Sequence, residues 1–324
     1  MISVALCTFN GSKYLEIQLQ SIVDQSLVPD EIVIGDDGST DDTLGIVEKF
    51  VKKYNNISWK IIQNNQRLGF CRNFLKTMKL CNGDYVFLSD QDDIWHKDKI
   101  MQMVDSMKYN HHINALFSSY ECIDSENNRL SFNYRLTNSI VFNLKSKLSR
   151  IVKYDYESFI KSMNIAGMSV CLKKEFIDRF LALNVDGISY HDTFICFFAS
   201  LLDSLYFFNK ALVQYRMHDN NQIGLDNAKN IVVDRIEWIK GDIAVQKELM
   251  RFAIVNNLDN EKIENLNQVI EFNNKRCQLL DSLDLFSLIK LIYIKKYYKG
   301  FFSYLGDIVY ILRNEKSKKE ENNE

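Results

Sequence analysis

The chain has 324 residues, of which 46% are hydrophobic and 25% are charged, a composition typical of a globular protein with a buried core. Lys and Arg number 40 and Asp and Glu number 42, so the formal net charge is −2. A chain with this balance has no overall basic field, and we expect no nucleic-acid partner.

Cysteine usage and the apolar runs indicate the cellular compartment of the protein. The seven cysteines form no CxxC pair, which is typical of free thiols in a reducing compartment. The first residues, MISVALCTFNGS, have no basic start and resemble a strand more than a signal peptide. No apolar run reaches the roughly 18 residues that a spanning helix needs. We therefore expect a cytoplasmic protein.

Apolar runs of strand length alternate with helical patterns through the first part of the chain. Strands are predicted at residues 2–8, 31–35, 59–63, 85–89 and 115–120, and helices at residues 13–25, 44–54, 70–80 and 97–109. Regular alternation of this kind predicts an α/β fold, with a mostly parallel central sheet flanked by helices. Such sheets bind ligands at the carboxyl ends of their strands.

The remaining chain is less regular from residue 127 to 192 and helical in pattern from residue 227 onward. Residues 285–313, LFSLIKLIYIKKYYKGFFSYLGDIVYILR, contain five basic residues and one acid among many aromatic residues. This composition is typical of an amphipathic segment at a membrane surface, and equally of a helical hairpin packed on its own domain. Peripheral contact with an anionic membrane is therefore one of two open expectations.

Polar clusters follow three of the predicted strands. They are TFNG at residues 8–11, DDGSTDDT at residues 36–43 and DQDD at residues 90–93. Acidic clusters at one edge of a sheet repel one another unless a cation compensates them. A divalent metal, Mn²⁺ or Mg²⁺, shared with a diphosphate would resolve this conflict, because hard cations bind carboxylate and phosphate oxygens together.

Each acidic cluster also has a purely structural interpretation. Asp92 or Asp93 could cap the helix that begins near residue 97, although three acids in four residues exceed what a cap needs. Ser39 is a good N-cap, and Asp42 three residues later makes an approximate capping box. That interpretation accounts for the later residues of DDGSTDDT but leaves Asp36 and Asp37 unexplained, and a carboxylate at a strand end can accept hydrogen bonds from a base or ribose. For DQDD we favour a function.

Four segments in order carry a resemblance to a known family. TFNGSKYLEIQLQSIVDQS, EIVIGDDGSTDDT, NNQRLGFCRN and GDYVFLSDQDDIW together resemble the inverting family 2 glycosyltransferases with the GT-A fold. The SDQDDIW wording further resembles bacterial rhamnosyltransferase-like members. Three later segments, NIAGMSVCLKKEF, YHDTF and VQYRMHDNN, are similar to the family's acceptor-side, catalytic-base and metal-completing segments.

The resemblance implies roles for individual residues. Contacts with the nucleotide sugar are implied for Thr8, Phe9, Asn10, Asp36, Asp37, Arg72, Asp90 and Gln91. Metal ligation is implied for Asp92, Asp93 and His218, and a place on the acceptor side for Gly167, Met168 and His191. Asp192 would be the catalytic base, although Asp is also a preferred N-cap for the apolar helix that follows it.

The implied reaction transfers a sugar from a nucleoside-diphosphate sugar to a hydroxyl of a glycan or lipid-linked acceptor, in bacterial surface polysaccharide synthesis. Residues 1–225 would form the GT-A domain, with a nucleotide-binding half at 1–110 and an acceptor half at 111–225. Residues 226–324 would form a helical C-terminal extension. A sugar nucleotidyltransferase is disfavoured, because TFNGSKY has one Gly and one Lys where a triphosphate-binding loop needs more. A degenerate, non-catalytic binding subunit remains an alternative.

Overall fold

Four parallel strands form the N-terminal part of the sheet. In the computed structural model, which describes residues 1–130, 149–163, 165–218, 235–291 and 297–321, their order is β3-β2-β1-β4. Their bounds are β1 (Ile2–Thr8), β2 (Glu31–Asp36), β3 (Ser58–Gln63) and β4 (Tyr85–Ser89). Because β1, β2 and β4 run parallel and in register, their carboxyl ends meet at one edge. The clusters that follow these strands are brought together there.

The sheet continues beyond β4 with mixed directions. These strands are β5 (Ile94–Trp95), β6 (Ala115–Ile123), β7 (Ile151–Lys153), β8 (Val170–Lys173) and β9 (Leu205–Arg216). β8 lies antiparallel between β4 and β6, and β6 pairs parallel with β9. β5 and β7 both add antiparallel to β9. The prediction of a mostly parallel sheet therefore holds for the first four strands, whereas the later pairings are mixed.

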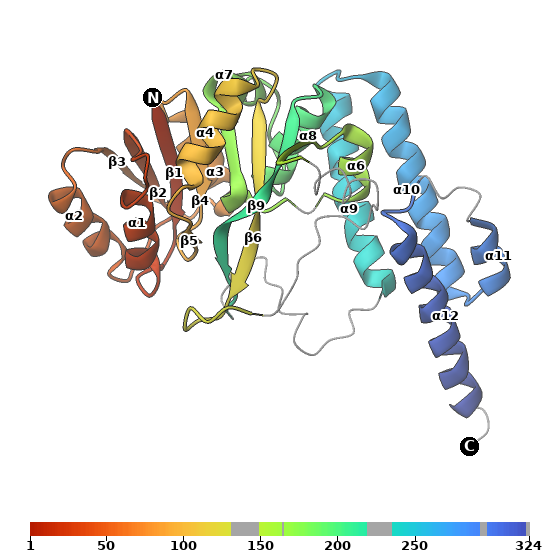
Figure 1. Ribbon diagram of the computed structural model, residues 1–324. Coiled ribbons are helices and arrows are strands. Elements are labelled where there is room, and N and C mark those ends of the chain that lie inside the picture. The colour runs from red at the N-terminus through yellow and green to blue at the C-terminus, as the bar shows by residue number, and fades with distance from the viewer. Residues whose placement is uncertain (131–148, 164, 219–234, 292–296, 322–324) are drawn as a thin grey trace. The chain divides into compact units, whose positions relative to one another are not determined.

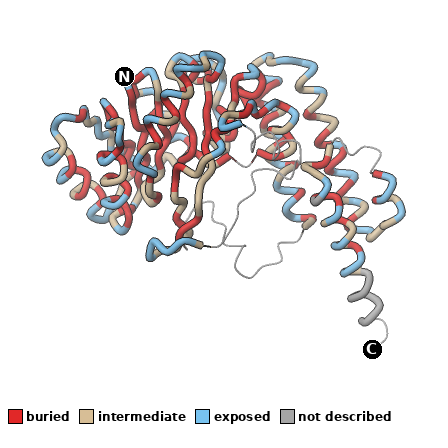
Figure 2. Tube along the Cα trace, in the orientation of Figure 1, coloured by how far each residue is buried: buried red, intermediate tan, exposed pale blue. Residues whose placement is uncertain are grey.

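Helices cover both faces of this sheet (Figure 1). One face packs against α1 (Leu15–Val23), α2 (Thr43–Lys53) and α4 (Lys99–Tyr109), whose apolar side chains share a core with alternate residues of β1 and β2. The other face packs against α3 (Phe70–Lys79), which also contacts α7 (Lys174–Leu181) and α8 (His191–Leu201). Buried residues accordingly run along the strands in Figure 2. The predicted α/β fold with a flanked central sheet is confirmed.

The C-terminal region is helical, as predicted. It contains α9 (Arg235–Val255), α10 (Asn260–Asp281), α11 (Leu285–Lys290) and α12 (Phe301–Glu321). α9 and α10 pack along one another through side chains such as Ile239, Leu249 and Val269, all of which are buried. The Asp259 carboxylate caps α10 by accepting from two backbone amides of its first turn.

The chain divides into two compact units. The first comprises Met1–Tyr134, Ser149–Asp155 and Asn164–Gly224, and the second comprises Arg135–Leu148, Tyr156–Met163 and Leu225–Glu324. The short helix α6 (Tyr156–Lys161) thus belongs with the C-terminal helices, although it falls within the range 111–225 that the sequence assigns to the acceptor half. The boundary expected at residues 225–226 lies outside the described residues, as do Lys295 and Lys296.

Candidate active site

The loops that follow β1 and β2 are tied together by hydrogen bonds. Thr8 lies opposite Asp36 in the strand register, and its hydroxyl donates to Asp36 Oδ1 at 2.8 Å. Asp36 is fully buried and also accepts from the backbone and hydroxyl of Ser39 at 2.9 and 2.5 Å. The Asp36 carboxylate therefore fixes the conformation of the loop that follows β2.

Asn10 joins the same two loops from the exposed side. Its backbone is in the left-handed region with φ of 48°, and its amide donates to the Ser39 hydroxyl at 2.9 Å. Its side-chain oxygen accepts from the Thr40 amide at 2.8 Å. Ser39 thus links the two loops by hydrogen bonds. The prediction that Ser39 is the N-cap of α2 is wrong, because Asp42 occupies that position.

Asp37 holds the loop that leads into α3. Its carboxylate accepts from the backbone amides of Leu68 and Gly69 at 2.7 and 2.9 Å, and from the Asn64 side chain at 3.0 Å. Gly69 has φ of 82°, a conformation that other residues rarely adopt, and it is the N-cap of α3. Arg72, in the first turn of α3, is exposed.

Gln91 clamps the backbone of Phe9. The Phe9 amide donates to Gln91 Oε1 at 2.8 Å, and Gln91 Nε2 donates to the Phe9 carbonyl at 3.1 Å. A Cβ at Gly11 would lie 2.1 Å from Gln91 Oε1, so this contact requires glycine there. The Arg67 guanidinium carbon lies 3.9 Å from the centre of the Phe9 ring. An exposed cation is therefore stacked on the predicted nucleotide-binding loop.

Asp90 is the carboxylate that connects the strand edge with α8. Burial, followed by the nearby charges of Asp92 and Asp192, raises the pKa of Asp90 to about 8. The charges of Asp90 and Asp37 in turn add to the burial that raises the pKa of the Cys7 thiol. Asp90 therefore interacts electrostatically with Asp92 and with Asp192 of α8, while Asp37 and Asp90 both act on Cys7.

Asp92 and His218 form a direct contact between the β4 loop and the end of β9. Asp92 Oδ2 lies 2.9 Å from His218 Nε2, and the two side chains are only 15% and 12% exposed. The Tyr14 ring lies against His218 with a centroid separation of 4.9 Å. Two of the three predicted metal ligands are thus brought together.

Asp93 is turned toward the interior. It is fully buried, and its Oδ1 accepts from the backbone amide of Arg216 at 3.1 Å. Arg216 Nε donates to the carbonyl of Asp92 at 2.7 Å, so the end of β9 is fastened to the acidic loop. Burial and the charges of Asp92 and Asp90 raise the pKa of Asp93. Asp93 Oδ2 has no hydrogen-bond partner in the described part of the chain.

The predicted catalytic base lies in the first turn of α8. Asp192 Oδ1 accepts from the Thr193 amide at 2.7 Å, while a Cβ at Gly167 would meet Asp192 Oδ2 at 3.2 Å and His191 Nε2 at 3.3 Å. The alternative that Asp192 caps α8 is wrong, because Tyr190 is the N-cap. The absence of a side chain at Gly167 thus lets its backbone approach Asp192 and His191 closely.

His191 packs against α3 beside Asp192. Its ring stacks on Phe74 at a centroid distance of 4.0 Å, and burial lowers the pKa of His191. Neither of its ring nitrogens has a hydrogen-bond partner within the described ranges. A neutral imidazole here supports the wall of the site next to Asp192.

A buried amine holds the turn that contains Gly167 and Met168, which the sequence predicts to lie on the acceptor side. Met168, in the short 3₁₀ turn η1 (Gly167–Ser169), accepts at its carbonyl from Lys99 Nζ at 2.5 Å. The Lys99 amine also lies 3.7 Å from the Trp95 ring centre, and burial lowers its pKa to about 7. This contact joins α4 to the turn that carries Gly167.

No cluster of three or more His, Cys, Asp or Glu side chains suited to a metal occurs among the residues that the structure describes. The protein-derived part of a metal site would therefore be the Asp92–His218 pair. A histidine nitrogen and a carboxylate oxygen are a donor set that divalent transition ions accept.

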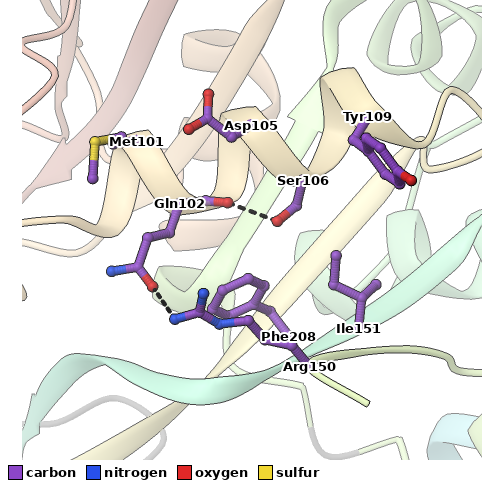
Figure 3. A pocket seen from close by; sticks show the side chains of 8 residues that line it. All are labelled: Met101, Gln102, Asp105, Ser106, Tyr109, Arg150, Ile151 and Phe208. Atoms are coloured by element: carbon purple, nitrogen blue, oxygen red, sulfur yellow. Dashed lines mark hydrogen bonds between the residues drawn. The ribbon is translucent and has the colours of Figure 1, made fainter.

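A pocket of about 400 Å³ lies elsewhere on this unit, between α4, residues 150–151 and β9 (Figure 3). Within it, Arg150 donates to Gln102 Oε1 at 2.9 Å, and the exposed Tyr109 stands at one end. Its lining contains none of the residues that the sequence predicts for the site. The pocket is therefore not the place where the carboxylates act.

Comparison with known proteins decides the family. Residues 3–179 match the model of glycosyl transferase family 2, more than half of the chain. The chain belongs to glycosyl transferase family 2. It is 30% identical to the dTDP-rhamnosyl transferase RfbG of Shigella flexneri, over 86% of this chain and 96% of that protein. It is also 29% identical to the abequosyltransferase RfbV of Salmonella typhimurium, over 74% of each chain.

Solved structures agree on the fold. The S. aureus protein TarS (residues 1–349, with UDP-GlcNAc) superposes with a TM-score of 0.57 at 16% identity, covering 82% of this chain and 70% of that one. The mannosyltransferase PcManGT of Pyrobaculum calidifontis, with GDP-Man and Mn²⁺, gives 0.56 at 14% identity, over 96% and 84%. These structures confirm the predicted GT-A fold. The family match and the curated relatives confirm the predicted family and the activity of a nucleotide-sugar glycosyltransferase.

Sequence reasoning missed four side chains around this site: Tyr14, Arg67, Lys99 and Arg216. A signal existed for Lys99, since it occupies the same helical face as the buried Met103 and Met107. Arg67 follows no pattern that distinguishes it from a solvated loop residue.

Proposed function

We propose that this family 2 enzyme transfers a deoxyhexose, with rhamnose from dTDP-rhamnose as the first candidate, to a hydroxyl of a glycan or lipid-linked acceptor. The transfer would invert the anomeric centre and serve bacterial surface polysaccharide synthesis. The carrying observation is that Asp192, Asp90 and the Asp92–His218 pair lie close enough to interact at one edge of the sheet. The similarity to a dTDP-rhamnosyl transferase over nearly its whole length supports the choice of donor.

The donor nucleotide would lie over the loops after β1 and β2. The exposed Asn10, the backbone of Phe9 and the loop held by Asp37 form one hydrogen-bonded surface there. The Arg67 guanidinium is stacked on Phe9 and would suit a diphosphate. Arg72 is exposed on the neighbouring helix turn and is a second candidate for the same anion.

Asp92 and His218 would hold a divalent metal, Mn²⁺ or Mg²⁺. The donor set fits, because the two ligand atoms already converge to 2.9 Å, and burial together with the charges of Asp92 and Asp192 raises the pKa of the neighbouring Asp90. When bound, the metal stabilises the negative charge on the departing nucleoside diphosphate. Asp93 and Arg216 would fix the loop that carries Asp92 and leave it little freedom to turn away.

Asp192 would accept the proton of the acceptor hydroxyl as that oxygen attacks the anomeric carbon. One of its carboxylate oxygens is held by the Thr193 amide, and the other faces Gly167. A carboxylate so positioned acts as a general base because the hydroxyl becomes acidic only as its bond to carbon forms. His191 and Gly167 would set the orientation of Asp192 and border the acceptor.

The substitution Asp192→Asn tests this role. We expect kcat to fall on the order of 10²–10⁴-fold, because the general base is lost, while binding of the donor nucleotide is retained. Transfer is measured with the sugar nucleotide and acceptor, and nucleotide affinity by calorimetry. The matched control Asp186→Asn, at an exposed loop position, should leave both unchanged. Near-normal turnover in Asp192→Asn would remove this residue from the mechanism.

A further inference from the structure

The buried Lys99 amine makes an unusual contact. Lys99 lies in the first turn of α4 and is 0% exposed, and its amine donates to the Met168 carbonyl at 2.5 Å. Among the residues that the structure describes, this is the only hydrogen bond of the amine, and it forms no ion pair with a carboxylate. The charge of a fully buried lysine is therefore directed at a single neutral carbonyl group.

An amine at this position is unfavourable for packing alone. Moving a charged group out of water costs free energy unless a counter-ion and hydrogen bonds compensate it. A methionine would fill a similar volume without that cost, as Met103 and Met107 do on the same buried face of α4. The amine of Lys99 is therefore explained by the carbonyl group that it binds and not by the core that its stem fills.

The carbonyl that Lys99 binds belongs to the turn next to Asp192. Met168 follows Gly167 in η1, and both residues are buried. A Cβ at Gly167 would lie 3.2 Å from Asp192 Oδ2 and 3.3 Å from His191 Nε2, so the backbone of the turn lies directly against these two side chains. Because the two residues are adjacent in the chain, a shift of the Met168 carbonyl would also shift the backbone that borders Asp192.

We propose that Lys99 is a positioning residue for sugar transfer. By holding the Met168 carbonyl, it keeps Gly167 close against the Asp192 carboxylate and so fixes the direction in which that carboxylate points. This inference rests on the proposed role of Asp192 as the general base, and Lys99 itself touches neither substrate. A base acts only within hydrogen-bond reach of the attacking hydroxyl, and a displacement of about 1 Å can lower the rate on the order of 100-fold.

Hydrolysis of a sugar nucleotide tests the proposal without the natural acceptor, because water then takes the place of the acceptor hydroxyl. dTDP-rhamnose, UDP-GlcNAc and GDP-mannose are supplied with Mn²⁺, and kinetics are measured with the one that the wild type hydrolyses fastest. We expect Lys99→Met to lower kcat at least about tenfold and to change the KM for the sugar nucleotide by less than about twofold. The exposed Lys108→Met, in the last turn of α4, is the matched control and should behave like the wild type.

Two further variants separate positioning from a structural role. If Lys99 acts through Asp192, adding Lys99→Met to Asp192→Asn should lower kcat little further, because both changes remove the same effect. Gly167→Ala disturbs the approach to Asp192 from the side of the turn and should also lower kcat. This second variant tests the same geometry if Lys99→Met does not fold.

The possible failures are distinguishable. Normal kcat in Lys99→Met or in Gly167→Ala, while Asp192→Asn is impaired, would overturn the proposal. So would independent, multiplicative losses in the double variant, or a raised KM with unchanged kcat in Lys99→Met. The last result would mean that Lys99 only balances the charges of Asp93 and Asp90. Normal kcat in Asp192→Asn would instead show that the proposed base is wrong, and the role of Lys99 would fall with it.

Discussion

The Lys99 amine is buried and lies close enough to the carboxylates of Asp93 and Asp90 to interact with their charges. It donates to the Met168 carbonyl and lies over Trp95, with no exposed surface. Burial lowers the pKa of Lys99 to about 7, although the charges of Asp93 and Asp90 oppose that shift. The same amine therefore supports the acceptor-side turn and faces the acidic loop from the inside of the protein.

Lys99 makes stability depend on pH in a predictable direction. The folded protein releases the Lys99 proton near pH 7, whereas the unfolded chain keeps it up to the ordinary value of 10.5. Unfolding between these values takes up a proton, so raising the pH favours the folded state by up to about 1.4 kcal/mol per pH unit. The free energy of unfolding is measured by urea denaturation for the wild type and for Lys99→Met. The difference between the two values should rise between pH 7 and 9. Parallel curves would contradict it, and the exposed Lys97→Met serves as control.

Residue type and position predicted part of the site but not the task of each acid. DQDD and DDGSTDDT predicted carboxylates at strand ends, and the acids of DQDD do interact with one another and, through Asp90, with Asp192. Yet Asp36 and Asp37 bind the protein's own amides, while Asp92 meets His218, 126 residues away. Which partner an acid finds depends on how the strand ends meet in space, and no local pattern contains that information.

Element boundaries followed from periodicity wherever an element was long enough to show a period. The first four strands and the helices between them lie within a few residues of the predicted positions. The strands β5 and β7 have two and three residues, too few for alternation to be visible. Their antiparallel pairing with β9, together with the antiparallel pairing of β8 with β4 and β6, makes the sheet mixed. Pairings between distant segments depend on tertiary packing, which a single sequence does not display.

Helices of the C-terminal unit are joined by a buried ionic network. The Asp307 carboxylate on α12 accepts from Arg276 on α10 and from Arg235 on α9, and the Tyr298 hydroxyl donates to it at 3.0 Å. The side chains of Asp307 and Arg276 are 0% and 2% exposed. One carboxylate therefore compensates two guanidinium groups from different helices.

Removing this carboxylate should loosen the three helices together. Asp307→Asn removes the carboxylate that pairs with the buried Arg276 and the partly buried Arg235, a change that costs about 3–5 kcal/mol. Because the chain has two units, we expect faster amide hydrogen exchange in α9, α10 and α12 and unchanged protection in β1, β2 and β4. The exposed Asp281→Asn on α10 is the control. Unchanged exchange in α12 of Asp307→Asn would show that the network is dispensable.

Within the whole molecule, the candidate active site and the C-terminal helices belong to different units. All the predicted site residues belong to the first unit, which also contains the family match apart from residues 135–148 and 156–163. Among the described residues of either unit, no helix is long and apolar enough to cross a bilayer.

The metal-dependent binding of the donor nucleotide tests the central claim most directly. dTDP, UDP and GDP are titrated in turn into the protein by calorimetry, with and without Mn²⁺. We predict that Mn²⁺ tightens binding of the preferred nucleotide at least tenfold, about 1.4 kcal/mol, and that Asp92→Asn abolishes this gain. The control Asp105→Asn, an exposed position on α4, should retain it. Equal affinity with and without Mn²⁺ in the wild type, or a full Mn²⁺ effect in Asp92→Asn, would contradict the site described.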